Sequence, residues 1–425
     1  MNKLIYLLFI TITIAKDIYI QPINGSTTSI AKQNGILFYN TIVNASINDR
    51  VILGKDTLIY MIPYQYFTNL NSITIELNGI IYLHNNISAW NYNENTQSYD
   101  NAIDIRNSNN LTITSNGNGI IDGQGYTWWI SFFKGEISRQ RPTMIYMENC
   151  IDSLIERIVL LDGPRFHIYA KNVLRFVTRY LTIWVEPDGF FPYNTDGIDV
   201  SGKDIYIHHI DISNYDDAIC VKPLDMDTPS LDNIIMNCSS DILVEHITVY
   251  RGVGLSIGSV ASTKNHCIKN VVYQYINVDF PIKLLYIKTG NRHNATTVQG
   301  YINNITYQHI KATHSLLWPI YIGPQQQKEP DGTGDGIWPP VNPYVDIQSI
   351  FLNNISIYTL NKPGSSGIIR CDSTNPCKNI ILKNVNIYNT NKQYICSSNH
   401  SILGSYDNYT YPYLDNCGLN KQPFS

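Results

Sequence analysis

The chain reads Asp204-Ile-Tyr-Ile-His-His-Ile-Asp-Ile212 at one point and Asp241-Ile-Leu-Val-Glu-His-Ile-Thr-Val249 at another. In both stretches aliphatic residues occupy alternate positions, two polar residues interrupt them, and the alternation then resumes. A period of two is typical of β-strands, because successive side chains of a strand point to opposite faces. We therefore interpret each stretch as two short strands separated by a polar break.

This pattern recurs along most of the chain. It returns at 268–278, 302–310, 347–357 and 379–387, and in related form at 71–83, 110–121 and 153–161. No segment has a sustained apolar stripe with the 3.6-residue period of a helix. Irregular intervals of about 28 to 45 residues between repeats favour stacked coils carrying loops of varying length. The sequence thus predicts an all-β fold, a single-domain right-handed parallel β-helix with coils of about twenty residues plus loops.

The composition is that of a folded chain. Of its 425 residues, 44% are hydrophobic and 15% are charged, which permits a large core and argues against disorder. The 30 Lys and Arg residues stand against 34 Asp and Glu, a net charge of −4. The chain therefore lacks the basic excess of a nucleic-acid-binding protein, and we expect no nucleic acid among its partners.

The first fifteen residues are arranged like a signal peptide. Lys3 precedes the apolar run 4–14, which is shorter than the roughly 18 residues that a membrane helix needs. We expect residues 1–15 to be a signal peptide, residues 16–425 to form the domain, and the protein to be secreted and not membrane-bound. Sequences of the form Asn-x-Ser/Thr agree with secretion; they begin at Asn24, Asn44, Asn86, Asn110, Asn237, Asn294, Asn304, Asn354, Asn399 and Asn408.

The eight cysteines are even in number, which fits disulfides formed in an oxidising compartment. Proximity in sequence predicts the pairs Cys371–Cys377 and Cys396–Cys417, and makes Cys220–Cys238 plausible. No Cys/His spacing indicates zinc. We expect no metal and no cofactor.

Three aspartates stand out: Asp196, and the adjacent pair Asp216 and Asp217. The step from Asp196 to Asp216 (216 − 196, about twenty residues) is close to one coil, which predicts that the carboxylates meet on neighbouring rungs. Hydrolysis of a glycosidic bond needs one protonated carboxyl and a second group that activates water, and clustered carboxylates raise the pKa of at least one member. Each aspartate alone is a common turn residue; together they favour a catalytic cluster.

On these motifs the sequence resembles the polygalacturonase-type glycoside hydrolases, glycoside hydrolase family 28, which are secreted pectinases with a pectin-lyase-like solenoid. The matching motifs are Gly119-Ile-Ile-Asp-Gly-Gln-Gly-Tyr-Thr-Trp-Trp129, Arg141-Pro142, Asn194-Thr-Asp196, Asp216-Asp217, Gly252-Val-Gly-Leu-Ser-Ile-Gly-Ser259 and Tyr286-Ile-Lys288. The resemblance covers nearly all of the chain after the predicted signal peptide.

The resemblance implies hydrolysis of α-1,4-galacturonosyl linkages with inversion. Asp216 would be the general acid, while Asp196 and Asp217 would position and deprotonate the attacking water. An inverting reaction implies carboxyl separations of roughly 6.5–9.5 Å. The implied substrate-binding residues are Asn194, Lys288, Tyr286 and Gly254.

Two positions depart from the family pattern. Val253 stands where the third motif usually has histidine, and Tyr286 where the fourth usually has arginine. Valine cannot donate a hydrogen bond, and tyrosine offers a ring and a hydroxyl in place of a bidentate cation. We therefore expect an acidic pectin-type polymer to be bound less tightly than by a typical polygalacturonase, with decorated or partly esterified substrate preferred. We interpret Lys222, six residues after Asp216, as a surface lysine.

Three functions remain open on the sequence: an inverting pectin hydrolase, a β-helical polysaccharide lyase with a Ca²⁺ site, and a glycan-binding protein without catalysis. The acidic motifs favour the hydrolase, whereas the departures from the family pattern at Val253 and Tyr286 are compatible with a binding protein. A hydrolase of another pectic or uncharged glycan is a further alternative. The expected partner is a pectic or related polysaccharide, bound by a monomer.

Overall fold

The polar breaks in the sequence are the corners of the coils. The second residue of each break has a φ angle in the left-handed region: 54° at His209, 55° at His246, 54° at Tyr275, 53° at His309 and 52° at Asn354. An extended chain turns sharply at such a residue. The two alternating halves of each repeat therefore lie on different faces of the coil.

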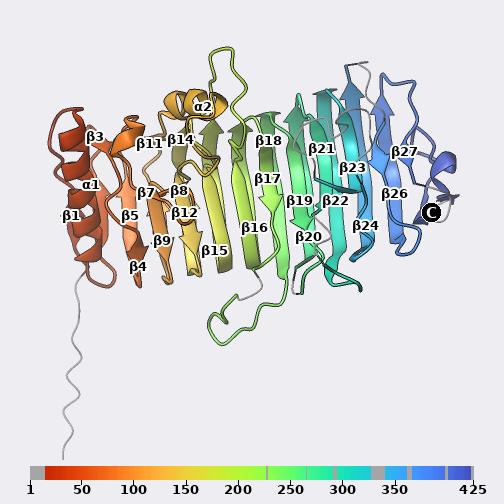
Figure 1. Ribbon diagram of the computed structural model, residues 1–425, viewed down its shortest axis with the longest axis horizontal. Coiled ribbons are helices and arrows are strands. Elements are labelled where there is room, and N and C mark those ends of the chain that lie inside the picture. The colour runs from red at the N-terminus through yellow and green to blue at the C-terminus, as the bar shows by residue number, and fades with distance from the viewer. Residues whose placement is uncertain are drawn as a thin grey trace, which may run out of the picture.

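A computed structural model gives the arrangement of these coils and describes residues 15–225, 228–264, 266–290, 294–326, 340–360, 366–397 and 401–422. The strands pair in parallel from coil to coil, and the stack runs from α1 at one end to the last strands at the other (Figure 1). Ile198 pairs with Ile219, which pairs with Leu255 on the next rung. The predicted right-handed parallel β-helix is confirmed.

One face of the β-helix carries the candidate site, and we call it the site sheet. Its strands, in order of pairing, are β4 (Phe67–Thr68), β9 (Ile103–Arg106), β12 (Ile145–Glu148), the first part of β15 (Ile168–Trp184) and of β16 (Ile198–Ser213), β17 (Asp217–Val221), β19 (Gly254–Val260), β21 (Lys283–Thr289), β23 (Trp318–Gln325), β25 (Ile368–Ile369) and β27 (Ile395–Cys396).

The remaining parallel strands form the other faces, together with the later parts of β15 and β16. They are β1 (Asp17–Tyr19), β2 (Arg50–Leu53), β3 (Leu58–Met61), β5 (Thr74–Leu77), β6 (Ile80–Leu83), β10 (Thr112–Thr114), β11 (Gly119–Asp122), β13 (Ile151–Glu156), β14 (Ile158–Leu161), β18 (Ser239–Arg251), β20 (Cys267–Asp279), β22 (Gly300–Ser315), β24 (Val345–Thr359), β26 (Cys377–Tyr388), β28 (Ile402–Tyr406) and β29 (Asn420–Lys421). A short antiparallel hairpin, β7 (Tyr92–Asn93) and β8 (Ser98–Tyr99), lies outside the coils.

The interior of the coils is one continuous apolar core, which extends from Ile20 to Leu419. Alternate residues of each strand point into it; Ile205, Ile207, Ile210 and Ile212 of β16 are at most 2% exposed. Burying such a side chain stabilises the fold by about 1.5–3 kcal/mol, and the repetition of this pattern holds the coils together.

The corners are also joined from rung to rung by their own side chains. The rings of His209 and His246 lie 4.8 Å apart, and those of Tyr275 and His309 stack at 5.0 Å. Further along, the Asn384 amide donates a hydrogen bond of 3.0 Å to Asn354 Oδ1. These ladders explain why histidine, tyrosine and asparagine occupy the polar breaks.

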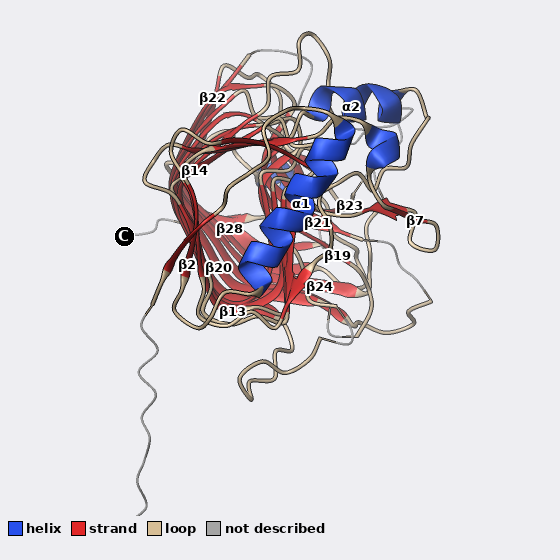
Figure 2. Cartoon of the chain, turned by 90° about the vertical axis from the view of Figure 1, so that its left-hand side faces the viewer, coloured by secondary structure: helices blue, strands red, loops and turns tan. Residues whose placement is uncertain are grey.

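Helix α1 (Thr28–Val43) covers the first coil like a lid across its open end (Figure 2). The sequence did not predict this helix, because it has no sustained apolar stripe. The buried positions are Ala31, Asn34, Gly35, Phe38 and Ile42, and two of these five are not apolar. Asn34 bonds to the backbone of Ile23, and a Cβ at Gly35 would lie 1.8 Å from the Ile62 carbonyl oxygen. The helix therefore packs through a polar residue and a close backbone approach.

Helix α2 (Gly125–Phe133) stands at the edge of the site sheet. It buries Trp128 and Trp129 but leaves Phe133 68% exposed. The Phe133 ring contacts Phe190, which belongs to the connection between β15 and β16, at 5.3 Å. Two 3-10 turns, η1 (Ile87–Ala89) and η2 (Asp415–Cys417), complete the described helices. Neither α-helix is long and apolar enough to cross a membrane, among the residues described.

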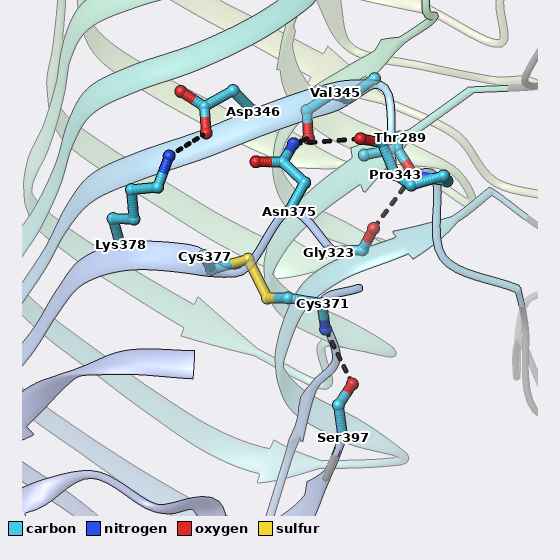
Figure 3. Close-up of a disulfide and its surroundings, with 10 residues drawn as sticks. All are labelled: Thr289, Gly323, Pro343, Val345, Asp346, Cys371, Asn375, Cys377, Lys378 and Ser397. Atoms are coloured by element: carbon cyan, nitrogen blue, oxygen red, sulfur yellow. Dashed lines mark hydrogen bonds and ion pairs between the residues drawn. A yellow bond between two sulfur atoms is a disulfide. The ribbon is translucent and has the colours of Figure 1, made fainter. Parts of the chain in front are cut away.

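Three disulfides are present. The predicted pairs Cys371–Cys377 and Cys396–Cys417 are confirmed, and Figure 3 shows the first of them beside β26. The pair Cys220–Cys238 is wrong, because Cys238 bonds to Cys267. Cys238 directly precedes β18 and Cys267 begins β20 on the next rung, whereas Cys220 lies within the site sheet, in register with Asp199 and Ser256. Most of the predicted signal peptide, residues 1–14, lies outside the described residues.

Candidate active site

The site lies where successive coils enter the site sheet. Asp196 comes two residues before β16, and Asp217 begins β17 on the next rung, directly after Asp216. The Gly197 amide donates a hydrogen bond of 2.9 Å to the Asp217 carbonyl oxygen, which joins the beginnings of these two strands. One carboxylate oxygen of each aspartate lies within 4.8 Å of those of the other two. The predicted convergence of the three carboxylates is confirmed.

The separation of the carboxylates differs from the expected one. Oxygens within 4.8 Å of one another are closer than the roughly 6.5–9.5 Å that inverting glycosidases usually have between carboxyl groups. The expected separation is therefore wrong for this cluster, because Asp216 and Asp217 are sequence neighbours and Asp196 lies only one rung away. The stereochemical outcome has to be argued from which carboxylates a sugar can reach.

Asp217 is held as an anion at the floor of the site. It is 1% exposed, and its Oδ2 lies 2.5 Å from Lys288 Nζ and 3.8 Å from Lys222 Nζ. Ser256 donates a hydrogen bond of 2.6 Å to Oδ1. Burial alone would raise the pKa of Asp217, but the two cations and the hydrogen bonds outweigh it and lower the pKa to about 2.

Asp216 is the most accessible of the three. Its Oδ2 accepts a hydrogen bond of 3.0 Å from the backbone amide of Asn194, and its Oδ1 accepts one of 2.9 Å from the backbone amide of Asp217. The side chain is half-buried and lines both cavities of the site. Burial, and then the charge of Asp217, raise the pKa of Asp216. It can therefore keep a proton at a pH where an ordinary aspartate has lost it.

Asp196 is 3% exposed, and its Oδ1 has no hydrogen-bond partner among the described residues. Burial, followed by the charges of Asp216 and Asp199, raises the pKa of Asp196 well above its usual value. It lines the same small cavity as Asp217. This carboxyl can accept a hydrogen bond from a small molecule bound between the two.

Two cavities flank Asp216. The smaller, of about 270 Å³, contains Asp196, Asp217 and Lys222 in its wall. The larger, of about 980 Å³, has Val253, Lys283, Tyr286 and Lys288 along the site sheet. The same cavity is also lined by an aromatic wall, which we define as Phe132, Phe133, Phe191, Tyr193 and Tyr215. A groove of this size admits more than one sugar residue.

The residues predicted to bind substrate take different positions. Asn194 contacts Asp216 with its amide, as above, and lines both cavities. Tyr286 and Lys288 line the larger cavity, although each is at most 3% exposed. Gly254 lines neither. A Cβ there would lie 1.8 Å from the Lys283 carbonyl oxygen, and its φ of 148° suits glycine, so Gly254 permits the close stacking of β19 on β21.

The two departures from the family pattern meet in one small apolar cluster. Val253 and Tyr286 pack with Trp318, Tyr321 and Ile368. The Tyr286 ring also lies 4.4 Å from Lys283 Nζ and 4.4 Å from Lys288 Nζ. The face of an aromatic ring attracts ammonium groups at this distance. At position 286 a tyrosine that packs in an apolar cluster thus stands in place of the arginine of the family pattern.

The interpretation of Lys222 as a surface lysine is wrong. Its ammonium lies 3.4 Å from Asp199 Oδ2, and its side chain is 21% exposed. Asp199 is fully buried, and its pKa is raised to about 6 by burial, against the lowering effect of Lys222. Lys222 directly follows β17, and Asp199 lies in the neighbouring strand β16. Placing them together from sequence would have required the register of the two strands.

Comparison with known proteins agrees with the predicted family and fold. The model of glycosyl hydrolases family 28 matches residues 61–405. The chain is 24% identical to a putative rhamnogalacturonase D of Aspergillus niger over 76% of this chain and 62% of that protein. It is 24% identical to a polygalacturonase of Cryptomeria japonica over 81% of this chain and 61% of that protein. The chain therefore spans less than two thirds of the length of either relative.

The fold likeness extends further than the sequence likeness. The crystal structure of an endo-xylogalacturonan hydrolase from Aspergillus tubingensis aligns with a TM-score of 0.70 at 16% identity. The alignment covers 96% of this chain and 99% of that one. The whole β-helix is therefore shared, while the side chains that line the groove have to be judged in this chain.

Proposed function

The chain belongs to glycosyl hydrolases family 28, and on that basis we propose that it is a secreted, monomeric glycosidase that cleaves the α-1,4-galacturonosyl linkages of a pectic polysaccharide with inversion. The observation that carries the proposal is the contrast between two adjacent carboxyls. Asp216 is half-buried with a raised pKa, and Asp217 is buried with a pKa lowered to about 2. One can remain protonated while the other is ionised, which is the division of labour that glycoside hydrolysis needs.

In the proposed reaction Asp216 donates its proton to the glycosidic oxygen as the bond from that oxygen to the anomeric carbon breaks. A water molecule attacks the anomeric carbon and gives a proton to the Asp217 carboxylate. Asp196 Oδ1, which has no partner among the described residues, accepts a hydrogen bond from this water. The products are two shorter chains, an ionised Asp216 and a protonated Asp217, and proton exchange with solvent restores the starting state.

Inversion is proposed on accessibility. A retaining reaction would require Asp196 or Asp217 itself to attack the sugar. Both are at most 3% exposed, and Asp217 is fixed by Lys288 and Ser256. Water is small enough to enter the 270 Å³ cavity between them and Asp216, so we infer that water is the nucleophile.

The aromatic wall supports a preference for substrate with apolar or decorated faces. Ring faces stack on the C–H surfaces of sugars, and Tyr286 and Val253 add apolar surface to the lining of the larger cavity. We therefore propose that partly esterified or side-chain-bearing pectic polymers are accepted. The rhamnogalacturonase and polygalacturonase names of the relatives agree with a pectic substrate.

A reducing-sugar screen tests the proposal. Homogalacturonan, xylogalacturonan, rhamnogalacturonan and uncharged glycans are each incubated with the wild-type protein and with Asp216→Asn. Release of reducing ends from a pectic polymer by the wild type, and its loss in the variant, is expected. Release from uncharged glycans alone would refute the pectic assignment.

A glycan-binding protein without catalysis is the second candidate, favoured by the apolar packing of Val253 and Tyr286. Binding of pectic oligosaccharides with no reducing ends released at any pH would support it. In a polysaccharide lyase Asp196, Asp216 and Asp217 would instead hold Ca²⁺, and the product would absorb in the ultraviolet through its 4,5-double bond.

A further inference from the structure

Three arginine side chains gather on the side of the site toward α2. Arg141 donates a hydrogen bond of 2.7 Å to the Pro164 carbonyl oxygen, and its guanidinium lies over the Phe132 ring at 4.3 Å. Arg165 lies over the Phe166 ring at 4.1 Å. Arg139 reaches the same region from the loop after α2. In the part of the chain that the structure describes, none of the three forms an ion pair with a carboxylate.

These cations act on one another. Burial, and then the charges of Arg165 and Arg139, lower the pKa of Arg141 to about 9. Burial likewise lowers the pKa of Arg165, and Arg139 contributes to that shift. An anion bound beside Arg139 would offset this repulsion. The charges of Asp196 and Asp216 partly offset it for Arg141, so the arginines and the catalytic carboxyls share one electrostatic environment.

Arg139 is the exposed member of the group and borders both cavities that flank Asp216. Its Nε donates a hydrogen bond of 3.1 Å to Asn194 Oδ1. The same Asn194 donates its backbone amide to Asp216. Asn194 thus connects the Arg139 guanidinium to the general acid of the proposed reaction, and the bond from Nε to Asn194 is the one side-chain hydrogen bond of Arg139 within the described residues.

We propose that Arg139 binds the carboxylate of a uronate residue adjoining the scissile bond. The inference rests on the proposed function and names the group that recognises the acidic substrate. A uronate next to three aspartates needs a cation to offset like-charge repulsion, and a guanidinium fork matches a carboxylate with two parallel hydrogen bonds. Lys288 serves this purpose poorly, because its ammonium is bound to Asp217.

In this proposal Arg139 supplies a guanidinium to the same cavity in which Tyr286 stands in place of the arginine of the family pattern. The weaker binding of acidic substrate expected from Tyr286 alone is thereby offset. No local motif marks Arg139 in the sequence, since it lies 55 residues before Asn194 and the two meet only through the stacking of coils.

The test measures binding in the Asp216→Asn background, which keeps the substrate intact. Calorimetric titrations compare trigalacturonate with its carboxyl-reduced, neutral counterpart. We expect Arg139→Met to weaken binding of trigalacturonate about 10- to 100-fold, as for loss of a charge-assisted pair, and to leave the neutral trisaccharide unaffected. Arg139→Lys should recover part of the loss, because lysine keeps the charge but not the fork. Arg50→Met, an exposed arginine paired with Asp17 at the far end of the β-helix, is the control.

The outcomes separate the inference from the proposed function. Equal losses for the acidic and neutral trisaccharides, or no loss for either, would overturn the role of Arg139. A wild-type protein that releases no reducing ends, combined with Arg139-dependent binding of trigalacturonate, would refute the hydrolase and uphold the inference. Circular dichroism of each variant checks that the fold is kept.

Discussion

The ammonium of Lys288 lies 2.5 Å from Oδ2 of Asp217, and neither side chain is more than 2% exposed. The two residues come from β21 and β17, two rungs apart on the site sheet. A buried cation in this position keeps Asp217 ionised beside Asp216, whose pKa is raised. Lys288 therefore acts directly on the proposed base, whereas the sequence motif had predicted that it contacts the substrate.

Replacement of Lys288 by methionine should move the pH dependence of activity. Without its closest cation the buried Asp217 carboxylate becomes less stable, so its pKa rises from about 2. The acid limb of the kcat profile should shift to higher pH, and kcat should fall at least tenfold near pH 4. The free energy of unfolding should drop by about 3–5 kcal/mol, because one partner of a buried ion pair is lost.

The control for this variant is Lys378→Met, which removes a lysine paired with Asp346 at 3.3 Å and about half exposed. Exposed pairs contribute about 0–1 kcal/mol, so stability and pH profile should both stay close to wild type. An unchanged acid limb in Lys288→Met would show that Lys222 alone holds Asp217 ionised.

Replacement of Asp216 by asparagine should lower kcat by about 10² or more, because the amide cannot donate the proton to the leaving oxygen. The fold should persist, since Asp216 is half-buried and the single side-chain oxygen of asparagine still accepts from one of the Asn194 and Asp217 backbone amides. Asp211→Asn is the matched control, an exposed aspartate of β16 on another face. Proton NMR of the first wild-type product should show the inverted anomer; retention would contradict the proposed role of water.

The disulfides should differ in their contributions to stability in the order of the loops they close. Cys238–Cys267 spans 29 residues and Cys371–Cys377 spans 6. Loop-closure entropy gives about 3.6 and about 2.2 kcal/mol for loops of these lengths. Replacing Cys238 and Cys267 by serine should therefore lower the free energy of unfolding, measured with denaturant, by about 1 kcal/mol more than replacing Cys371 and Cys377. Equal losses would indicate that packing at the ends of the coils, and not chain entropy, determines the effect.

The sequence revealed what depends on local pattern. The polar breaks at His209 and His246 predicted the coils, and the twenty-residue step from Asp196 to Asp216 predicted the catalytic cluster, because no long loop lies between those rungs. Where a long loop lies between two positions, the number of residues between them no longer indicates whether they lie on neighbouring rungs. The segment between β17 and β18 separates Cys220 from Cys238 onto different faces, and Cys267 becomes the partner.

The rest of the site depends on register between distant coils. Arg139 meets Asn194 across 55 residues, and Lys222 meets Asp199 only because β16 and β17 pair with Asp199 opposite Cys220. Helix α1 escaped detection because Asn34 and Gly35 occupy buried positions that a helical stripe would fill with apolar residues. In each case the deciding contact is a backbone approach or a polar pair, which hydrophobic periodicity does not record.

Asp199 should make the protein less stable as the pH rises from 4 to 7. It is fully buried, its oxygens have no hydrogen bond among the described residues, and its folded pKa is raised to about 6. A carboxyl whose pKa is higher in the folded state contributes stability that is complete below its unfolded pKa, near 3.9, and is lost as the pH rises through the folded value. A shift of about two units corresponds to about 3 kcal/mol.

Urea unfolding of wild type and Asp199→Asn at pH 4 and pH 7 measures this effect. The free energy of unfolding of the variant, relative to that of the wild type, should be about 2–3 kcal/mol higher at pH 7 than at pH 4. Parallel pH dependence of the two proteins would mean that Lys222 keeps Asp199 ionised in the folded state at pH 4 as well.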